Sequence, residues 1–133
     1  KWDLANDSVL VSASDDGYLR ISDIRTAKEV GSFHFDSKVE NFSADPFNPM
    51  QIHASFDNGH IGGIDFRAGC KPLYDIAVSS KAVTSISVSG KHQGLLCTTG
   101  IDGAMNVYNA SKGEKPAFVC REFANQVMFF HLG

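Results

Sequence analysis

The feature that most constrains the fold of this chain is a repeat of forty-odd residues. The stretch SASDDGYLRISD ends at Asp23, ASFDNGHIGGID ends at Asp65 and TTGIDGAMNVYN ends at Asn109, so these ends lie 42 and 44 residues apart. The glycine in the middle of each stretch keeps the same spacing. A period of this length is typical of repeat folds, in which each unit buries its apolar face against the next unit. We therefore interpret the chain as an array of similar structural units.

Each repeat is centred on a tight turn within a strand-like pattern. Val9, Val11 and Ala13 occupy every second position, and this period of two predicts a half-buried strand. An Asp-Gly or Asn-Gly pair follows and supplies the positive-φ positions that a tight hairpin requires. Aspartate in such a turn bonds its own backbone, so we interpret these carboxylates as turn residues and not as an acid–base pair or a calcium site. The six predicted hairpin residues are Asp16, Gly17, Asn58, Gly59, Asp102 and Gly103.

The strand content of each repeat is that of a β-propeller blade. Further strands are predicted at 18–24, 60–66 and 104–108, each followed by a polar turn and a third strand, and in the first two units a fourth strand follows. No amphipathic helix is evident. The prediction is an all-β fold with blades of four antiparallel strands. About three blades fit into residues 1–133, with units ending near 23, 65 and 109. Closure of a ring takes roughly four to eight blades, so the chain is predicted to be part of a larger propeller.

Two stretches resemble the WD-repeat family, in which a blade has a Ser-x-Ser-x-Asp hairpin entry and ends its third strand with Trp-Asp. SASDDGYLRISD has that layout, and FSADPFNPMQIHAS resembles the family's link into the next blade. Trp2-Asp3 spells the Trp-Asp ending, but it lies only 20 residues before Ser22-Asp23, about half a blade. We therefore predict a missing segment between residues 3 and 8, unless the Trp-Asp match is accidental.

The chain departs from the family at the positions where WD-repeat blades carry a tryptophan and a histidine. Ser22, Ile64 and Tyr108 occupy the tryptophan position, and Phe35 and Ser79 occupy the position of the histidine in the preceding loop. In the family these two residues form a hydrogen-bonded network with a strand serine and the turn aspartate. We therefore expect these blades to rely on strand pairing and apolar packing more than on that network.

Candidate catalytic and metal-binding motifs are absent from the sequence. It contains no Gly-x-Ser-x-Gly elbow and no phosphate-binding loop, and its five histidines and three cysteines show no metal-ligand spacing. We expect the histidines to be exposed residues of turns or strand edges, and Cys70, Cys97 and Cys120 to be free thiols. The prediction is a protein that is not an enzyme, with no catalytic, cofactor-binding or metal residues and no small-molecule substrate; a propeller enzyme is the alternative from another class.

The chain is weakly acidic on average, but its basic residues follow a local pattern. The formal net charge of -3 gives no global attraction to nucleic acid or anionic membrane, and no apolar stretch approaches the roughly 20 residues of a membrane span. We expect a soluble, intracellular protein. A pair of basic residues nevertheless follows each third strand, on the face opposite to the hairpins. This basic rim either binds phosphates of RNA or an acidic protein segment, or consists of ordinary solvated turn residues. Its members are Arg25, Lys28, Arg67, Lys71, Lys112 and Lys115.

Several short motifs resemble the C-terminal blades of a nucleolar member of the WD-repeat family. They are the turn Asp65-Phe66-Arg67, the strand start Lys71-Pro72-Leu73 and the VMFF stretch at 127–130. The resemblance implies a non-catalytic scaffold for protein or ribonucleoprotein assembly in large ribosomal subunit biogenesis. It also implies a location in the nucleus or nucleolus, with pre-ribosomal proteins or rRNA as partners and no membrane association. The alternative is a WD-repeat adaptor of another complex, such as a ubiquitin ligase.

Overall fold

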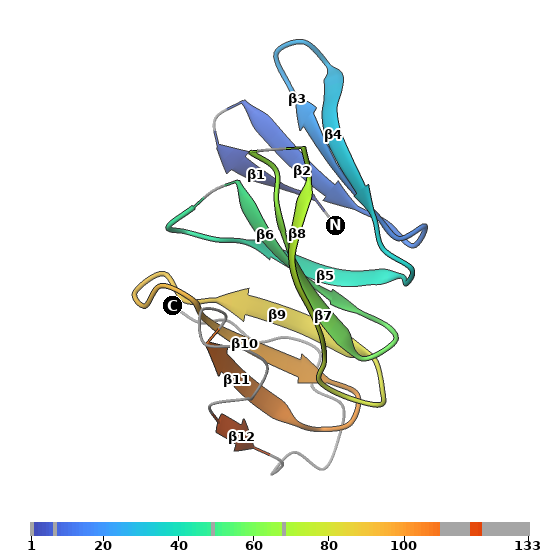
Figure 1. Cartoon of the computed structure of the whole chain (residues 1–133), viewed down its shortest axis with the longest axis vertical. Helices are drawn as coiled ribbons and strands as arrows, with labels where there is room; N and C mark the ends of the chain where they lie inside the picture. Colours follow the sequence, from blue (N-terminus) through green and yellow to red (C-terminus); the bar gives the residue numbers. More distant parts are fainter. Residues whose placement is uncertain (1, 7, 49, 68, 110–117, 121–133) are drawn as a thin grey trace.

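Three antiparallel sheets make up the part of the chain that the structure describes (Figure 1). The computed structural model describes residues 2–6, 8–48, 50–67, 69–109 and 118–120. These residues form twelve strands and no helix, and each sheet contains four strands that follow one another in the chain. The predicted all-β fold of four-stranded propeller blades is confirmed. Figure 1 shows the three sheets stacked along the long axis of the molecule, with the second between the other two.

We call the three sheets blade 1, blade 2 and blade 3. Blade 1 contains β1 (Trp2–Asn6), β2 (Val9–Ala13), β3 (Tyr18–Asp23) and β4 (Lys28–His34). Blade 2 contains β5 (Val39–Ala44), β6 (Gln51–Phe56), β7 (His60–Asp65) and β8 (Lys71–Ala77). Blade 3 contains β9 (Val83–Val88), β10 (Leu95–Gly100), β11 (Met105–Asn109) and β12 (Phe118–Cys120). Adjacent strands in each blade are hydrogen-bonded in sequence order, so every blade is a meander.

The Trp2-Asp3 stretch lies in a different place from the one that its sequence indicates. β1 pairs with β2, with Leu4 opposite Leu10, and therefore forms the first strand of blade 1. A Trp-Asp ending would instead lie at the end of a third strand, so the pairing of this stretch differs from the one that the motif indicates. The missing segment between residues 3 and 8 stays a prediction, because the pairing concerns the chain as given.

The hairpin glycines occupy the turns between the second and third strand of each blade. Gly17, Gly59 and Gly103 have φ values of 80°, 87° and 75°, a backbone conformation that residues with a side chain rarely adopt. A second constraint is close approach: a Cβ on Gly59 would lie 2.0 Å from the backbone oxygen of Ser79. The loop that leaves each of the first two blades therefore packs directly on that blade's own hairpin, and only glycine leaves room for it.

Two apolar clusters hold the blades together. Between blades 1 and 2, Phe42, Leu19 and Ile52 are fully buried, and between blades 2 and 3 Ile61 and Leu96 are buried to a similar degree. Burial of each such side chain contributes roughly 1.5–3 kcal/mol. Because blade 2 has a neighbour on either face, five of the six residues in both β6 and β7 are buried.

Two of the three cysteines lie among the described side chains, and both are free thiols. Cys70 is half-buried and Cys97 is buried. Burial raises the pKa of the Cys97 thiol to about 11, so this group is a small apolar side chain at neutral pH. The side chain of Cys120 lies outside the described residues.

Candidate functional site

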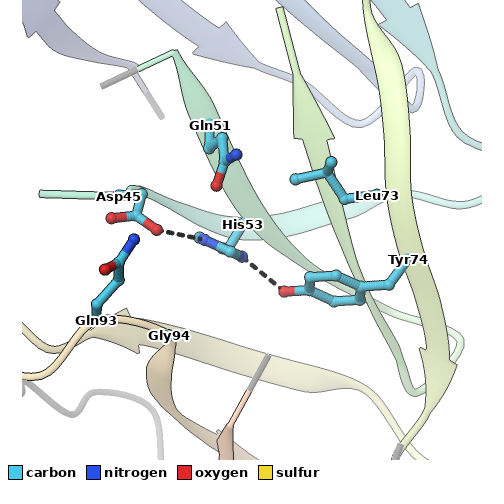
Figure 2. Close-up of a pocket in the computed structure, with 7 residues that line it drawn as sticks. All are labelled: Asp45, Gln51, His53, Leu73, Tyr74, Gln93 and Gly94. Carbon is cyan, nitrogen blue, oxygen red and sulfur yellow. Dashed lines mark hydrogen bonds and ion pairs between the residues drawn. The ribbon is translucent and has the colours of Figure 1, made fainter. Parts of the chain in front are cut away.

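A cleft of about 530 Å³ lies between blades 2 and 3 (Figure 2). Its walls come from the loop between β5 and β6, from β6 and β8, and from the loop between β9 and β10 of the next blade. Figure 2 shows the amide groups of Gln51 and Gln93 on either side of the buried pair Asp45 and His53. The seven residues that line this inter-blade cleft are Asp45, Gln51, His53, Leu73, Tyr74, Gln93 and Gly94.

The carboxylate of Asp45 is fixed by the turn in which it lies. Its Oδ1 atom accepts a hydrogen bond of 2.8 Å from the backbone N–H of Phe47, as is common for aspartate at the start of a turn. The turn is closed by the backbone N–H of Asp45, which donates to the carbonyl of Gln51 at 2.9 Å. The Asp-Pro-Phe-Asn sequence therefore holds a carboxylate that is 5% exposed at one end of β6.

A chain of hydrogen bonds runs from Asp45 through His53 to Tyr74. The Nε2 atom of His53 lies 3.4 Å from Oδ2 of Asp45, and its Nδ1 atom lies 2.7 Å from the Tyr74 hydroxyl. Because an ionised carboxylate only accepts, Nε2 carries the proton, and a neutral imidazole then accepts at Nδ1 from Tyr74. Burial and the nearby Asp45 charge hold the pKa of Tyr74 well above its ordinary value, so the hydroxyl keeps its proton. The bonds from His53 and Phe47 hold the pKa of Asp45 below its usual range, which keeps it ionised at neutral pH.

A glycine in the central strand makes this chain possible. His53 pairs with Gly63, which pairs with Tyr74, so the three form one row across the sheet. A Cβ on Gly63 would lie 2.5 Å from Cε1 of Tyr74, so the ring lies over the bare backbone and reaches the imidazole. His53 and Tyr74 are stacked with ring centroids 5.8 Å apart.

The equivalent row in blade 1 is apolar, which explains why the cleft is confined to one junction. Val11, Ile21 and Gly31 occupy that row, and Phe66 and Cys70 of blade 2 approach Gly31. The space left between blades 1 and 2 at this place is about 110 Å³. In blade 3, the described pair at these positions is Cys97 and Val107. Among the described residues, the polar row is therefore a property of blade 2.

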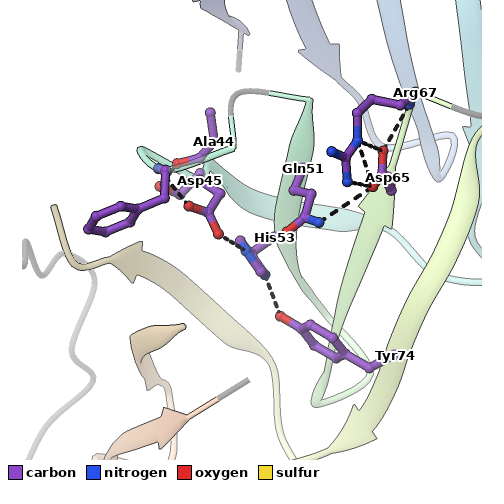
Figure 3. Close-up of polar contacts among 9 residues, drawn as sticks. Ala44, Asp45, Gln51, His53, Asp65, Arg67 and Tyr74 are labelled. Carbon is purple, nitrogen blue, oxygen red and sulfur yellow. Dashed lines mark hydrogen bonds and ion pairs between the residues drawn. The ribbon is translucent and has the colours of Figure 1, made fainter. Parts of the chain in front are cut away.

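The predicted basic rim is partly neutralised within its own turns (Figure 3). Arg67 donates to both carboxylate oxygens of Asp65, with Nη2 at 2.5 Å from Oδ2, and Gln51 reaches the same carboxylate at 3.4 Å. Arg25 pairs with Asp23 at 3.4 Å in the same turn of blade 1. The arginine bonds hold the pKa values of both aspartates below the usual range. Both arginine side chains stay largely exposed, at 74% and 57%.

The two described lysines of the rim lie at the same end of the strands as its arginines. Lys28 and Lys71 are the exposed first residues of β4 and β8. Lys112 and Lys115 lie outside the described residues. The structure thus brings Arg25, Lys28, Arg67 and Lys71 to the ends of the strands opposite to the hairpins, and the binding role of this rim stays a prediction.

At the opposite end of the strands, loop serines make a link that resembles the one made by histidine in WD-repeat blades. Ser79, at the family's histidine position, donates to Oδ2 of Asp102 at 2.8 Å. Ser37, in the corresponding loop before β5, donates to Asp57. Each bond ties a loop to the hairpin of the blade that follows it. The buried apolar clusters agree with the expectation that apolar packing holds the blades. The serine bonds between loop and hairpin were not predicted from the sequence.

The inter-blade cleft was not predicted from the sequence, because His53 was expected to be exposed. The prediction that the histidines are exposed is wrong for this one, which is 3% exposed. The alternation of apolar and polar residues in β6 is equally compatible with an exposed position for His53. The available signal was Gly63, a small residue within a strand, since such residues mark places where another group approaches closely.

The described part of the chain contains no group of three or more histidine, cysteine, aspartate or glutamate residues that could hold a metal ion. No helix in that part is long and apolar enough to cross a membrane.

Comparisons with known proteins show the fold. No family model matches the chain, and no curated protein matches it. Among solved structures 1069 chains match, a breadth that indicates a common architecture. One, from the crystal structure of the mitotic checkpoint complex, matches with a TM-score of 0.80 and 18% identity over 91% of this chain. Together with the three four-stranded antiparallel sheets, this match shows that the chain has the fold of WD-repeat propeller blades. The chain covers 36% of the length of that solved chain.

Proposed function

We propose that this chain is a non-catalytic scaffold that holds together a protein or ribonucleoprotein assembly. The observation that carries the proposal is that several charged side chains at both ends of the strands are fixed by local bonds. Asp16 accepts from the backbone N–H of Tyr18 at 3.0 Å and from Arg20 at 2.8 Å, and Arg67 is held by Asp65. A surface whose charges are ordered before binding loses less conformational entropy when a partner docks. The WD-repeat fold supports the same role, since its neighbour is part of a protein complex.

The finer proposal is a role in the assembly of the large ribosomal subunit in the nucleolus. Its support is the likeness to the C-terminal blades of periodic tryptophan protein 1, through Asp65-Phe66-Arg67 and Lys71-Pro72-Leu73. The exposed arginines of the basic rim support it as well, because a guanidinium with one edge on a carboxylate still presents donors to a phosphate. Pre-ribosomal proteins or rRNA are the proposed partners.

Affinity purification followed by mass spectrometry tests the proposal. Ribosomal and pre-ribosomal proteins are the expected result. Recovery of ubiquitin ligase subunits would instead support the adaptor alternative and contradict the ribosomal role. Recovery of no stable partner would contradict the scaffold function and direct attention to the propeller enzyme.

The basic rim has a separate test in RNA binding at increasing salt. If the rim binds phosphates, log affinity falls steeply with log salt concentration, and the slope decreases when Arg67, Lys71, Lys112 and Lys115 are replaced by glutamate. A matched control is replacement of Lys38 and Lys81, which lie at the hairpin end of the strands. Equal RNA binding by the rim variant and the parent would contradict a phosphate-binding rim.

A further inference from the structure

We propose, on the basis of the scaffold function above, that the inter-blade cleft binds a lysine or arginine side chain from an extended segment of a partner protein. The cleft volume of about 530 Å³ falls within the range of roughly 300–1,000 Å³ that is usual for specific binding pockets. Of the polar groups that would recognise a cation, Asp45 is buried, Gln51 is half-buried and Gln93 is exposed, and an apolar group lies at the wall of the cleft. Three features of the cleft support this occupant.

The first feature is the charge of the cleft. Asp45 is the one residue among the seven lining side chains with a formal charge at pH 7, counting histidine neutral, and none of the seven is lysine or arginine. Its carboxylate is ordered before any ligand arrives, because Phe47 and His53 hold it. An ionised carboxylate has about four acceptor sites, and the bonds from Phe47 and His53 occupy two of them. The carboxylate can therefore also accept a hydrogen bond from a ligand.

The second feature is the amide pair at the cleft. Gln51 and Gln93 lie on either side of Asp45 and come from different blades (Figure 2). Their carbonyl oxygens are acceptors, which suits the several N–H groups of an ammonium or guanidinium. An anionic ligand would face the Asp45 carboxylate and is disfavoured by like-charge repulsion.

The third feature is a β-bulge that places an apolar side chain at the wall. Gly63 pairs with Tyr74 and Ile64 pairs with Pro72, so Leu73 is the extra residue of the bulge. The bulge lets both Leu73 and Tyr74 line the cleft, and bulges are frequent next to binding sites. Leu73 is 42% exposed, although it is a large apolar residue. Leu73 and the Tyr74 ring offer a surface for the aliphatic stem of lysine or arginine, whose charged end then lies near Asp45.

Blade 1 contains a matched control for this site. Ile21 pairs with Gly31 and Ser22 pairs with Glu29, so Val30 is the extra residue of an equivalent bulge. Val30 is 63% exposed and lies on β4, as Leu73 lies on β8. The row beside Val30 is the apolar one, without histidine or tyrosine. A lysine introduced at either residue should be tolerated by the fold, because Leu73 is 42% exposed and Val30 is 63% exposed.

The test uses short capped peptides with a central lysine, arginine, norleucine or glutamate between Gly-Ser and Ser-Gly, titrated into the labelled chain and followed by NMR. The lysine and arginine peptides should shift the side-chain amides of Gln51 and Gln93 and the backbone amide of Gly94. They should bind at least about tenfold more tightly than the norleucine peptide, the ratio expected for one charge-assisted hydrogen bond. Leu73→Lys and Gln93→Lys should each abolish these shifts, whereas Val30→Lys should leave them unchanged.

Several results would overturn the proposal: equal binding of the norleucine and lysine peptides, no shift with any peptide, or binding that survives Leu73→Lys. The affinity purification described above is repeated with the Leu73→Lys and Val30→Lys variants. If the parent and both variants recover the same assembly proteins, the cleft inference is wrong and the scaffold function stands. If the parent recovers none, the scaffold function itself is contradicted, and the peptide titration still decides whether the cleft binds a cationic side chain.

Discussion

Replacement of Gly63 by alanine is predicted to break the hydrogen-bonded row of blade 2. The new Cβ would lie 2.5 Å from Cε1 and 3.0 Å from Cδ1 of Tyr74, so the ring has to move away from His53. The 2.7 Å bond between the hydroxyl and Nδ1 is then lost, and a buried ring nitrogen is left without its partner. Such a loss costs about 1–3 kcal/mol.

The alanine also has a favourable effect that reduces the net change. Glycine loses more conformational freedom on folding than alanine, and in a strand this difference is roughly 0.5–1 kcal/mol. The free energy of unfolding of Gly63→Ala should therefore be about 1–2 kcal/mol lower than that of the parent. Urea denaturation followed by fluorescence or circular dichroism measures it, and the m-value should stay constant because the surface exposed on unfolding is unchanged.

A double-mutant cycle with Tyr74→Phe separates this mechanism from simple crowding. Tyr74→Phe removes the same hydrogen bond and leaves the ring, so Gly63→Ala should cost about 1–2 kcal/mol less in the Tyr74→Phe background. Tyr18→Phe serves as a control, because the contacts of Tyr18 with His34 and Arg20 are made by its ring. Effects that add within about 0.5 kcal/mol would refute the reasoning, since the two substitutions would then act independently.

Two further predictions concern the hairpins and the acid sensitivity of the cleft. In parallel denaturation, Gly59→Ala should lower the free energy of unfolding more than Gly69→Ala. Both glycines have φ near +80°, but only a Cβ at Gly59 would meet the backbone, 2.0 Å from the Ser79 oxygen. Equal losses would show that φ alone matters. The folded-state pKa of Asp45 is lowered, so its stabilising effect is complete above the unfolded value of about 3.9 and is lost as pH falls below it. Unfolding measured from pH 7 to pH 3 should therefore be less acid-dependent in Asp45→Asn, with a residual slope from carboxylates such as Asp65; an unchanged slope would contradict the role given to Asp45.

The fold was largely predictable from the sequence because its determinants are local. The spacing of the Asp-Gly and Asn-Gly pairs marks the hairpins, and alternation such as Val9, Val11 and Ala13 marks the strands between them. Each of these patterns involves residues close together in the chain. The exception is Trp2-Asp3, whose motif indicates the end of a third strand, whereas the structure pairs it as the first strand of blade 1.

The candidate site was not predictable in the same way. Asp45, His53 and Tyr74 come from a loop and two non-adjacent strands, and Gln93 comes from the next blade. The direct link between Ser79 and Asp102 also joins residues that are far apart in sequence. The ion pair between Asp65 and Arg67 is an intermediate case, because both residues lie in one turn, but the pattern of basic residues indicated only the position of Arg67.

The sequence by itself determined the number of repeats, the position of each hairpin and the alternation of strand residues, because turn geometry and the period of two depend on neighbours in the chain. Only the tertiary structure decided that His53 is buried, that the Tyr74 ring crosses Gly63 to reach it, and that a cleft remains between blades 2 and 3. The physical reason is that both faces of blade 2 are covered. A polar residue on such a strand keeps its place only with a hydrogen-bond partner, and that partner is supplied across the sheet by strand register.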